Sequence, residues 1–196
     1  MSDDDAKKLA RFVYEALHTK RVARSGWWVA GVDLPESVAE HGFGTALIAY
    51  LLAVMEGADA ERAMAMAVFH DVPEARFNDL HKVAQRYVDV DRAEMDAARD
   101  QAASLPDAIG SRYRELHEEL RKRRTPEALV VRDADLIECL AQARYYEQRG
   151  FPVSEWIVNS EKGVTTQSGR KLAAALRSMP PKTWYEGLKA HLPGGE

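Results

Sequence analysis

The sequence has little cysteine and no long uninterrupted apolar run. Cys139 is the only cysteine among 196 residues, so the chain cannot form an internal disulfide and suits a reducing compartment. No apolar stretch approaches the roughly 20 residues that span a bilayer. The first residues, Met1–Asp5, are acidic, whereas a signal peptide begins with basic and then apolar residues. We therefore expect a cytoplasmic protein without a membrane segment.

Net positive charge is also missing. The chain carries 27 Lys and Arg against 31 Asp and Glu, a formal net charge of −4, which gives no long-range attraction for nucleic acid or anionic lipid. The basic run Arg121–Arg124 is an exception, but it follows Glu118 and Glu119 at the end of an expected helix, where cations are favourable. We interpret it as a solvated helix end and predict no nucleic-acid binding. An anionic substrate must then be held by a local cluster of side chains or by a metal.

The pattern that is present is helical. The composition, 46% hydrophobic and 30% charged, is typical of a globular domain, and apolar residues recur at intervals of three and four. The expected helices cover about 6–19, 37–55, 59–71, a short segment from 79, 91–103, 107–124, 126–150, a short segment around 156, 170–179 and a last turn near 184. The stretch 20–36 predicts an ordered loop. We predict an all-α protein with a single domain over 1–196, a core of about 9–175 and C-terminal helices at 154–190 packed on it.

Signals at the helix ends support these boundaries. Ser37 and Glu40 have the spacing of a capping box, in which each residue satisfies a backbone N–H near the other. The segment Thr125–Glu127 combines a cap residue, a proline at the first helical position and an acid in the first turn. Gly150 and Pro152 are typical of a helix that has ended. Two long helices are therefore expected to begin at residues 37 and 126.

Four ionisable residues stand where the helical pattern is apolar: His41, His70, Asp71 and Asp135. A buried ionised carboxylate costs several kcal/mol unless it is paired or bound to a metal. A single histidine in an apolar helix is more often a satisfied core residue than a ligand. Two histidines and two acids together favour a shared divalent cation, whose charge the two carboxylates balance. Their mixed nitrogen and oxygen donors suit one Mn, Fe, Co, Ni or Zn ion, with Mg as a further candidate.

Such a centre predicts hydrolysis of a phosphate ester. A divalent cation polarises the phosphoryl group and activates a water molecule near neutral pH. Two nearby residues have other interpretations. Asp133 lies two positions from Asp135 and therefore points to a different helix face. Cys139 is interpreted as a small buried apolar residue rather than as a nucleophile or ligand.

The order His…His-Asp…Asp and its surroundings resemble the HD-domain superfamily, and within it the group of bacterial 5′-deoxynucleotidases and their eukaryotic HD-domain relatives. The resemblance extends over about residues 9–175. The segments that carry it are 21–27 (RVARSGW), 35–41 (PESVAEH), 69–74 (FHDVPE), 78–80 (NDL) and 125–127 (TPE), which leads into 132–135 (RDAD). The resemblance implies an HD-type helical bundle with the metal site between central helices. It also implies His41, His70, Asp71 and Asp135 as the metal ligands.

The resemblance further implies residues that handle the attacking water. Glu74 and Asp79 match the acids that have this role in the family. Glu74 also follows His70 by four residues and would share its face if the helix continued. The alternatives are a solvated turn acid for Glu74 and a helix cap for Asp79.

Substrate contacts are implied in the same way. Arg24 matches the arginine that binds phosphate through its planar fork, and Trp27 would wall the sugar-base pocket. In the bacterial enzymes the tryptophan follows the arginine directly, whereas Ser25 and Gly26 intervene here, which leaves the deoxyribose preference open. Lys82 is a further candidate for phosphate contact, with a solvent-facing lysine as the alternative.

The leading hypothesis is a metal-dependent phosphomonoesterase that converts nucleoside 5′-monophosphates to nucleoside and phosphate. One alternative keeps the site but changes the substrate to a phosphodiester or another small phosphate ester. A second alternative is a non-catalytic helical binding protein in which the histidines and acids are structural. A homodimer is compatible with all three hypotheses.

Overall fold

The structure is a computed structural model that describes residues 1–188. Within these residues the chain is helical, with one isolated bridge between Ala23 and Ser37 and no strand. The elements are α1 (Asp3–His18), η1 (Thr19–Arg21), α2 (Gly26–Val29), α3 (Val38–Glu56), α4 (Ala60–Phe69), η2 (Val72–Ala75), α5 (Lys82–Gln85), α6 (Val90–Ser104), α7 (Asp107–Lys122), α8 (Pro126–Gln148), α9 (Ser154–Gly163), α10 (Gln167–Ser178) and η3 (Pro181–Tyr185). The all-α prediction is confirmed.

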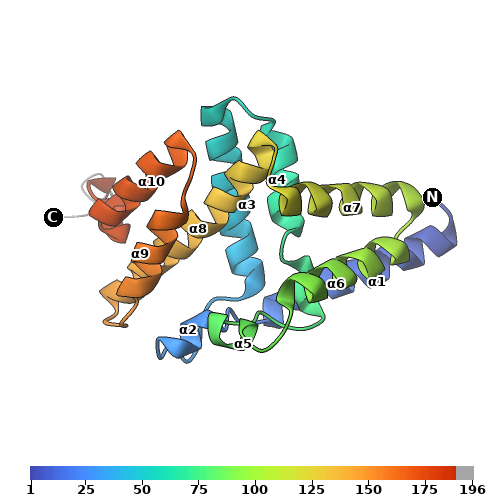
Figure 1. Cartoon of the computed structure of the whole chain (residues 1–196), viewed down its shortest axis with the longest axis horizontal. Coiled ribbons are helices and arrows are strands. Elements are labelled where there is room, and N and C mark those ends of the chain that lie inside the picture. The colour runs from blue at the N-terminus through green and yellow to red at the C-terminus, as the bar shows by residue number, and fades with distance from the viewer. Residues whose placement is uncertain (189–196) are drawn as a thin grey trace, which may run out of the picture.

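Helices α3 and α8 form the centre of the bundle. Both α4 and α8 pack against α3, and α9 and α10 pack against α8. Figure 1 shows α9 and α10 on one side of this centre and α1, α6 and α7 on the other, with the two ends of the chain on opposite sides. The predicted C-terminal helices therefore correspond to α9 and α10, and the last two residues of the range 154–190 lie outside the described residues.

Small side chains line the contacts among the central helices. The main core cluster includes Ala49 and Ala53 of α3, Ala63 of α4 and Ala134 of α8, all of which are fully buried. Because interhelical distance depends on side-chain size at the contact, these alanines let the helices approach closely. Polar side chains on the same helices can therefore reach across the gap.

The start of α3 is fixed as predicted. The Ser37 hydroxyl accepts a hydrogen bond from the Glu40 backbone N–H, and the Glu40 carboxylate accepts one from the Ser37 backbone N–H at 2.6 Å. The capping box is confirmed, and it sets the first turn of the helix directly before His41. At the start of α8, the Thr125 hydroxyl accepts from the Ala128 N–H, also as predicted.

Three predicted boundaries differ from the structure. The expected loop at 20–36 contains the short helices η1 and α2. Helix α4 ends at Phe69, so His70 and Asp71 lie in the turn that follows it, and Asp71 has φ −104° and ψ 8°. Pro73 lies in the next short helix, η2, and it has no backbone N–H to donate to the Phe69 carbonyl, so α4 cannot continue through it. The helix expected from about 79 begins at Lys82.

Helix α3 corrects the expectation that no segment approaches membrane-spanning length. An 18-residue window of this 19-residue helix has a mean hydropathy of 1.5, and by length and composition the helix could cross a bilayer. It packs on α4, α8 and α10 in the bundle centre and buries His41 and Thr45. It is therefore a core helix of the bundle, although its outer face is also apolar.

Candidate metal centre

His41 lies on the inner face of α3 and is fully buried. Its Nδ1 is 2.5 Å from Oε2 of Glu138 on α8. Its Nε2 is 3.4 Å from Oδ1 of Asp135 and 3.6 Å from Oδ2 of Asp71. Glu138 therefore holds one ring nitrogen, and the other points to the place where two carboxylates converge.

His70 is oriented by the end of its own helix. Its Nδ1 lies 2.6 Å from the Ala67 carbonyl oxygen. A carbonyl only accepts, so Nδ1 carries the proton and Nε2 keeps its lone pair. That Nε2 is buried without a hydrogen-bond partner and lies 3.1 Å from Oδ2 of Asp71. A buried polar atom without a partner is costly, and a cation would satisfy it.

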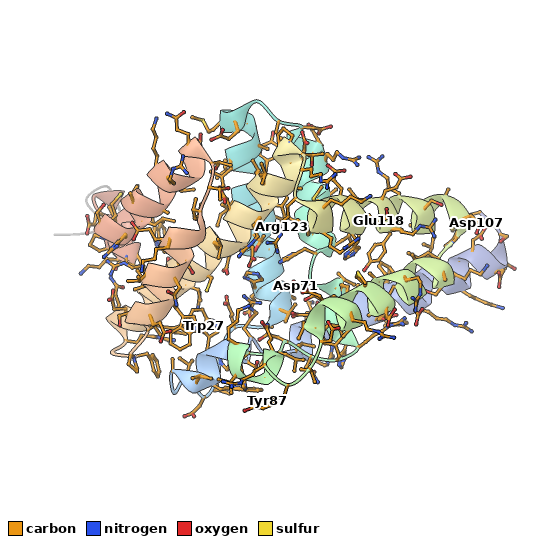
Figure 2. The ribbon with its side chains drawn as sticks, in the orientation of Figure 1. Trp27, Asp71, Tyr87, Asp107, Glu118 and Arg123 are labelled. Atoms are coloured by element: carbon orange, nitrogen blue, oxygen red, sulfur yellow. The ribbon has the colours of Figure 1, made fainter. Side chains whose placement is uncertain are left out.

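The four predicted ligands come together. One donor atom each from His41, His70 and Asp71 lie within 4.8 Å of one another, and Asp135 approaches the group through its contact with His41. Figure 2 labels Asp71 near the middle of the molecule, between the central helices and the α1, α6 and α7 side. The set is drawn from α3, the turn after α4, and α8.

The charges of the group favour a cation. Burial and the positive charge of Arg24 oppose protonation of His41, but contacts with Asp135 and Glu138 outweigh them and raise the pKa of His41 to about 10. Burial would raise the pKa of Asp71, yet His70, His41 and Arg24 hold it at about 2. Without a metal ion, the negative charge of the site is therefore balanced by protons on the histidines. A metal ion would have to displace these protons to bind.

These residues fit a divalent ion. Two neutral imidazoles and two carboxylates balance a charge of two. A neutral His70 has a buried Nε2 lone pair with no hydrogen-bond donor beside it, which a metal ion would satisfy. The group is therefore a candidate metal site, and its mixed donors suit a transition metal.

Arg24 and Asp79 lie directly beside this group. Nη1 of Arg24 is 3.6 Å from Oδ2 of Asp71 and 3.5 Å from Oδ1 of Asp79. Asp79 also accepts a hydrogen bond from the Ser25 backbone N–H. Asp79 therefore anchors the Arg24–Ser25 turn against the site. It does not cap α5, whose N-terminal cap is His81.

Glu74 is buried on η2. Its Oε2 has no hydrogen-bond partner, and burial together with the charges of Asp71 and Asp79 raises the pKa of Glu74 to about 10. The alternative of a solvated turn acid is wrong. A nearby cation favours the ionised form of a carboxyl group, so an ion held by the four ligands would convert Glu74 into a base.

Comparison with known proteins identifies the family. The HD-domain family matches residues 16–176 of this sequence. The chain belongs to the HD-domain family. The 5′-deoxynucleotidase HDDC2 of Danio rerio is 30% identical over 146 residues, which are 72% of this chain and 72% of that protein.

Solved structures agree with this HD-domain assignment. A conserved hypothetical protein from Pyrococcus furiosus superposes with a TM-score of 0.74 and 34% identity, covering 87% of this chain and 99% of that one. The HD phosphohydrolase DatZ of cyanophage S-2L, solved with dA and one catalytic Zn²⁺ ion, has a TM-score of 0.54 and 16% identity, covering 85% of this chain and 96% of that one. The second comparison shows the shared HD fold.

Trp27 lies in the core of this HD-domain chain, whereas it was predicted to form a wall of the sugar-base pocket. Its ring is 2% exposed and packs against Tyr146 and Trp156, and its Nε1 donates to Oε1 of Glu36 at 2.9 Å. Gly26 begins α2, and the helical turn directs Trp27 into the core while its neighbour Trp28 is exposed. Trp27 supports the site from behind and has almost no surface for a nucleotide.

Lys82 lies at the exposed start of α5, where its Nζ donates to Oε1 of Gln85 at 2.8 Å. Its exposure and its hydrogen bond to Gln85 agree with the alternative interpretation of Lys82 as a solvent-facing lysine.

Two residues near the ligands in sequence lie outside the metal group, as predicted. Asp133 is fully buried and accepts hydrogen bonds from the backbone N–H groups of Thr165 and Thr166 at 2.9 and 2.7 Å. Cys139 packs beside an apolar cluster, and burial raises the pKa of its thiol to about 12. A thiol in this state is a poor nucleophile.

Glu36 and Glu138 were not among the predicted site residues, although both lie beside His41. Glu138 had a local signal, because it follows Asp135 by three residues and so shares its helix face. Glu36 comes from the segment before α3, and no local pattern connects it with the ligands. It comes close to Glu138 only because α3 and α8 pack together.

Proposed function

We propose that this HD-domain chain is a metal-dependent phosphomonoesterase that releases nucleoside and phosphate from deoxynucleoside 5′-monophosphates. The observation that carries the proposal is the donor group of His41, His70, Asp71 and Asp135 with the Arg24 guanidinium 3.6 Å from Asp71. A cation and an arginine side by side can neutralise a phosphate monoester from two directions. The name of the HDDC2 relatives supports this substrate class.

Each residue then has a defined task. A divalent ion held by the four ligands would polarise a phosphoryl oxygen and acidify a water molecule. Arg24, oriented by Asp79, donates to the remaining phosphate oxygens. Glu74 accepts a proton from the attacking water, since its buried carboxyl group has an oxygen without a hydrogen-bond partner and feels the charges of Asp71 and Asp79. We propose Mn, Co, Fe, Ni or Zn ahead of Mg as the ion, because imidazole donors suit these metals.

Phosphate release tests the proposal. Purified protein, freed of metal and reloaded with Mn²⁺, Co²⁺, Zn²⁺ or Mg²⁺, is assayed against ribo- and deoxyribonucleoside 5′-monophosphates. We expect turnover of deoxyribonucleotides that requires the added metal. Release from phosphodiesters alone, or no release from any monophosphate with any ion, would contradict the proposal.

Arg24 should have a large effect on substrate use. We expect Arg24→Ala to lower kcat/KM by about 10²-fold, because a charge-assisted bidentate contact contributes roughly 3 kcal/mol. Arg24→Lys keeps the charge but loses the fork, so it should recover only part of the loss. Steady-state kinetics on one deoxynucleotide measure both variants. Wild-type kcat/KM in Arg24→Ala would exclude a phosphate contact by this residue.

We also propose that the protein is cytoplasmic and does not bind nucleic acid. The basic run Arg121–Arg124 ends α7 and is exposed beside acids, with Nζ of Lys122 at 3.4 Å from Oε2 of Glu118. The net charge of −4 adds no broad attraction.

A homodimer is the remaining part of the proposal, and the outer face of α3 supports it. Six large apolar side chains of this helix are 39% to 74% exposed: Phe43, Leu47, Tyr50, Leu51, Val54 and Met55. At roughly 200 Å² for a large side chain, their exposed parts amount to an apolar area on the order of 700 Å². The largest patch on a typical monomer is about 300–600 Å², and one partner's share of a standard interface is about 800 Å². We propose that a second copy of the chain covers this face.

Charge on this face should separate the two copies. We expect the variant Leu47→Glu/Leu51→Glu to be monomeric, because each added carboxylate would be desolvated in the interface. Leu34→Glu is the matched control, since Leu34 is 92% exposed and lies outside α3. Sedimentation velocity of the three proteins measures the mass. A monomeric wild-type protein would contradict the proposed dimer.

A further inference from the structure

His41 of the metal group forms a buried pair with Glu138, a carboxylate that is not one of the four predicted ligands. Nδ1 of His41 and Oε2 of Glu138 are 2.5 Å apart, and the two residues are separated by 97 positions in the sequence. Both are buried. With its Nδ1–H donated to a carboxylate, the His41 ring presents the lone pair of Nε2 toward Asp71 and Asp135.

The second ligand histidine has a weaker partner. Nδ1 of His70 donates to the neutral carbonyl oxygen of Ala67, whereas His41 donates to a carboxylate. A carboxylate partner fixes the ring and increases the basicity of the opposite nitrogen, and removal of such partners typically costs 10–100-fold in metal affinity. Glu138 should therefore strengthen the His41 contact with a cation.

Gly44 provides the space through which Glu138 reaches His41. A Cβ atom at Gly44 would lie 2.7 Å from Cγ and 3.1 Å from Oε1 of Glu138. Glycine inside a helix costs about 0.5–1 kcal/mol relative to alanine, so this position in α3 has a packing reason. At Gly42, two residues earlier in the same helix, an added Cβ would meet nothing within 4 Å.

A second buried acid, Glu36, lies beside Glu138. Donor atoms of Glu36, His41 and Glu138 lie within 4.8 Å of one another. Glu36 accepts from the Trp27 indole N–H at 2.9 Å, and its backbone N–H donates to the hydroxyl oxygen of Tyr146 at 3.0 Å. Trp27 and Tyr146 of the buried aromatic cluster thus fix the position of Glu36 next to His41 and Glu138.

We propose that Glu138 is a positioning residue for the metal ligand His41, and that the absence of a side chain at Gly44 leaves the space that Glu138 occupies. The inference rests on the proposed metal-dependent function, but it concerns metal affinity and is tested without substrate. Glu138 contacts neither the proposed substrate nor the attacking water. It acts through the orientation and basicity of the His41 ring.

Titration of metal-free protein with Mn²⁺ alone tests the proposal. We compare wild type with Glu138→Gln, Gly44→Ala and Gly42→Ala, and thermal melting confirms that each variant is folded. We expect the Kd for Mn²⁺ to rise by about 10–100-fold in Glu138→Gln and Gly44→Ala, and to stay within about twofold in Gly42→Ala. If both changes act through one contact, the double variant Gly44→Ala/Glu138→Gln should bind no more weakly than the weaker single variant.

The outcomes separate this inference from the proposed function. A lower melting temperature with unchanged Kd in Glu138→Gln would make the residue merely structural and overturn the inference. A wild-type protein that binds no divalent ion would overturn the proposed function as well. If Gly44→Ala does not fold, the Kd for Mn²⁺ of Glu138→Gln relative to wild type decides whether the inference holds.

Discussion

Replacement of Glu74 by glutamine should lower kcat by about 10²–10⁴-fold, the usual contribution of a positioned general base. Glutamine keeps the volume and the hydrogen-bonding capacity but cannot accept the proton. The four ligands remain, so we expect wild-type metal content and nearly unchanged nucleotide binding. Single-turnover phosphate release and elemental analysis measure the two properties on the same sample.

Two other outcomes for Glu74→Gln would change the assignment. If the variant loses its metal, Glu74 is a ligand and the set of four is incomplete. If it turns over at the wild-type rate, another base operates, and Asp79 is the next candidate because it lies beside Arg24. Glu118→Gln is a suitable control, since Glu118 is exposed on α7 and pairs only with Lys122 among the described interactions.

Replacement of Asp71 by alanine should abolish metal retention and reduce activity by about 10³-fold or more, since several kcal/mol of transition-state stabilisation depend on the ion. Oδ2 of Asp71 lies 3.1 Å from Nε2 of His70 and 3.6 Å from Nε2 of His41. Its loss therefore removes the shared anion between both histidines. Elemental analysis after dialysis against metal-free buffer measures the effect.

Asp133→Asn is the matched control for Asp71→Ala. Asp133 is equally polar and fully buried, but its carboxylate accepts from the start of α10 and lies outside the metal group. We expect Asp133→Asn to lower the melting temperature while it keeps the metal. A full complement of metal in Asp71→Ala would contradict the proposed coordination.

Much of the fold could be predicted because its signals are local. Apolar periodicity and caps identify helices from residues only a few positions apart, and the box at Ser37 and Glu40 occurs as expected. His41 and Asp135 were recognisable for the same reason, since each is an ionisable residue among apolar neighbours in its own helix. Helix ends were harder, because the turn at His70–Asp71 depends on Pro73 and on the packing that follows.

The predictions for Trp27 and α3 were wrong because they depended on tertiary contacts. The position of Trp27 depended on whether residues 26–29 form a helix, and α2 turned the ring into a cluster with Tyr146 and Trp156. The apolar character of α3 was visible in the sequence. Which face of the helix is buried depends on where α4, α8 and α10 pack against it.

By itself the sequence determined the all-α class, the two long central helices and the residues of the candidate metal site. Only the tertiary structure decided which side chains support those donors. Glu138 meets His41 across 97 residues and Asp79 meets Ser25 across 54. The physical reason is that the first pair depends on how α3 and α8 pack and on the missing side chain at Gly44, whereas the second depends on how the turn before α2 lies against the segment before α5. Contacts between such distant segments leave no local periodicity.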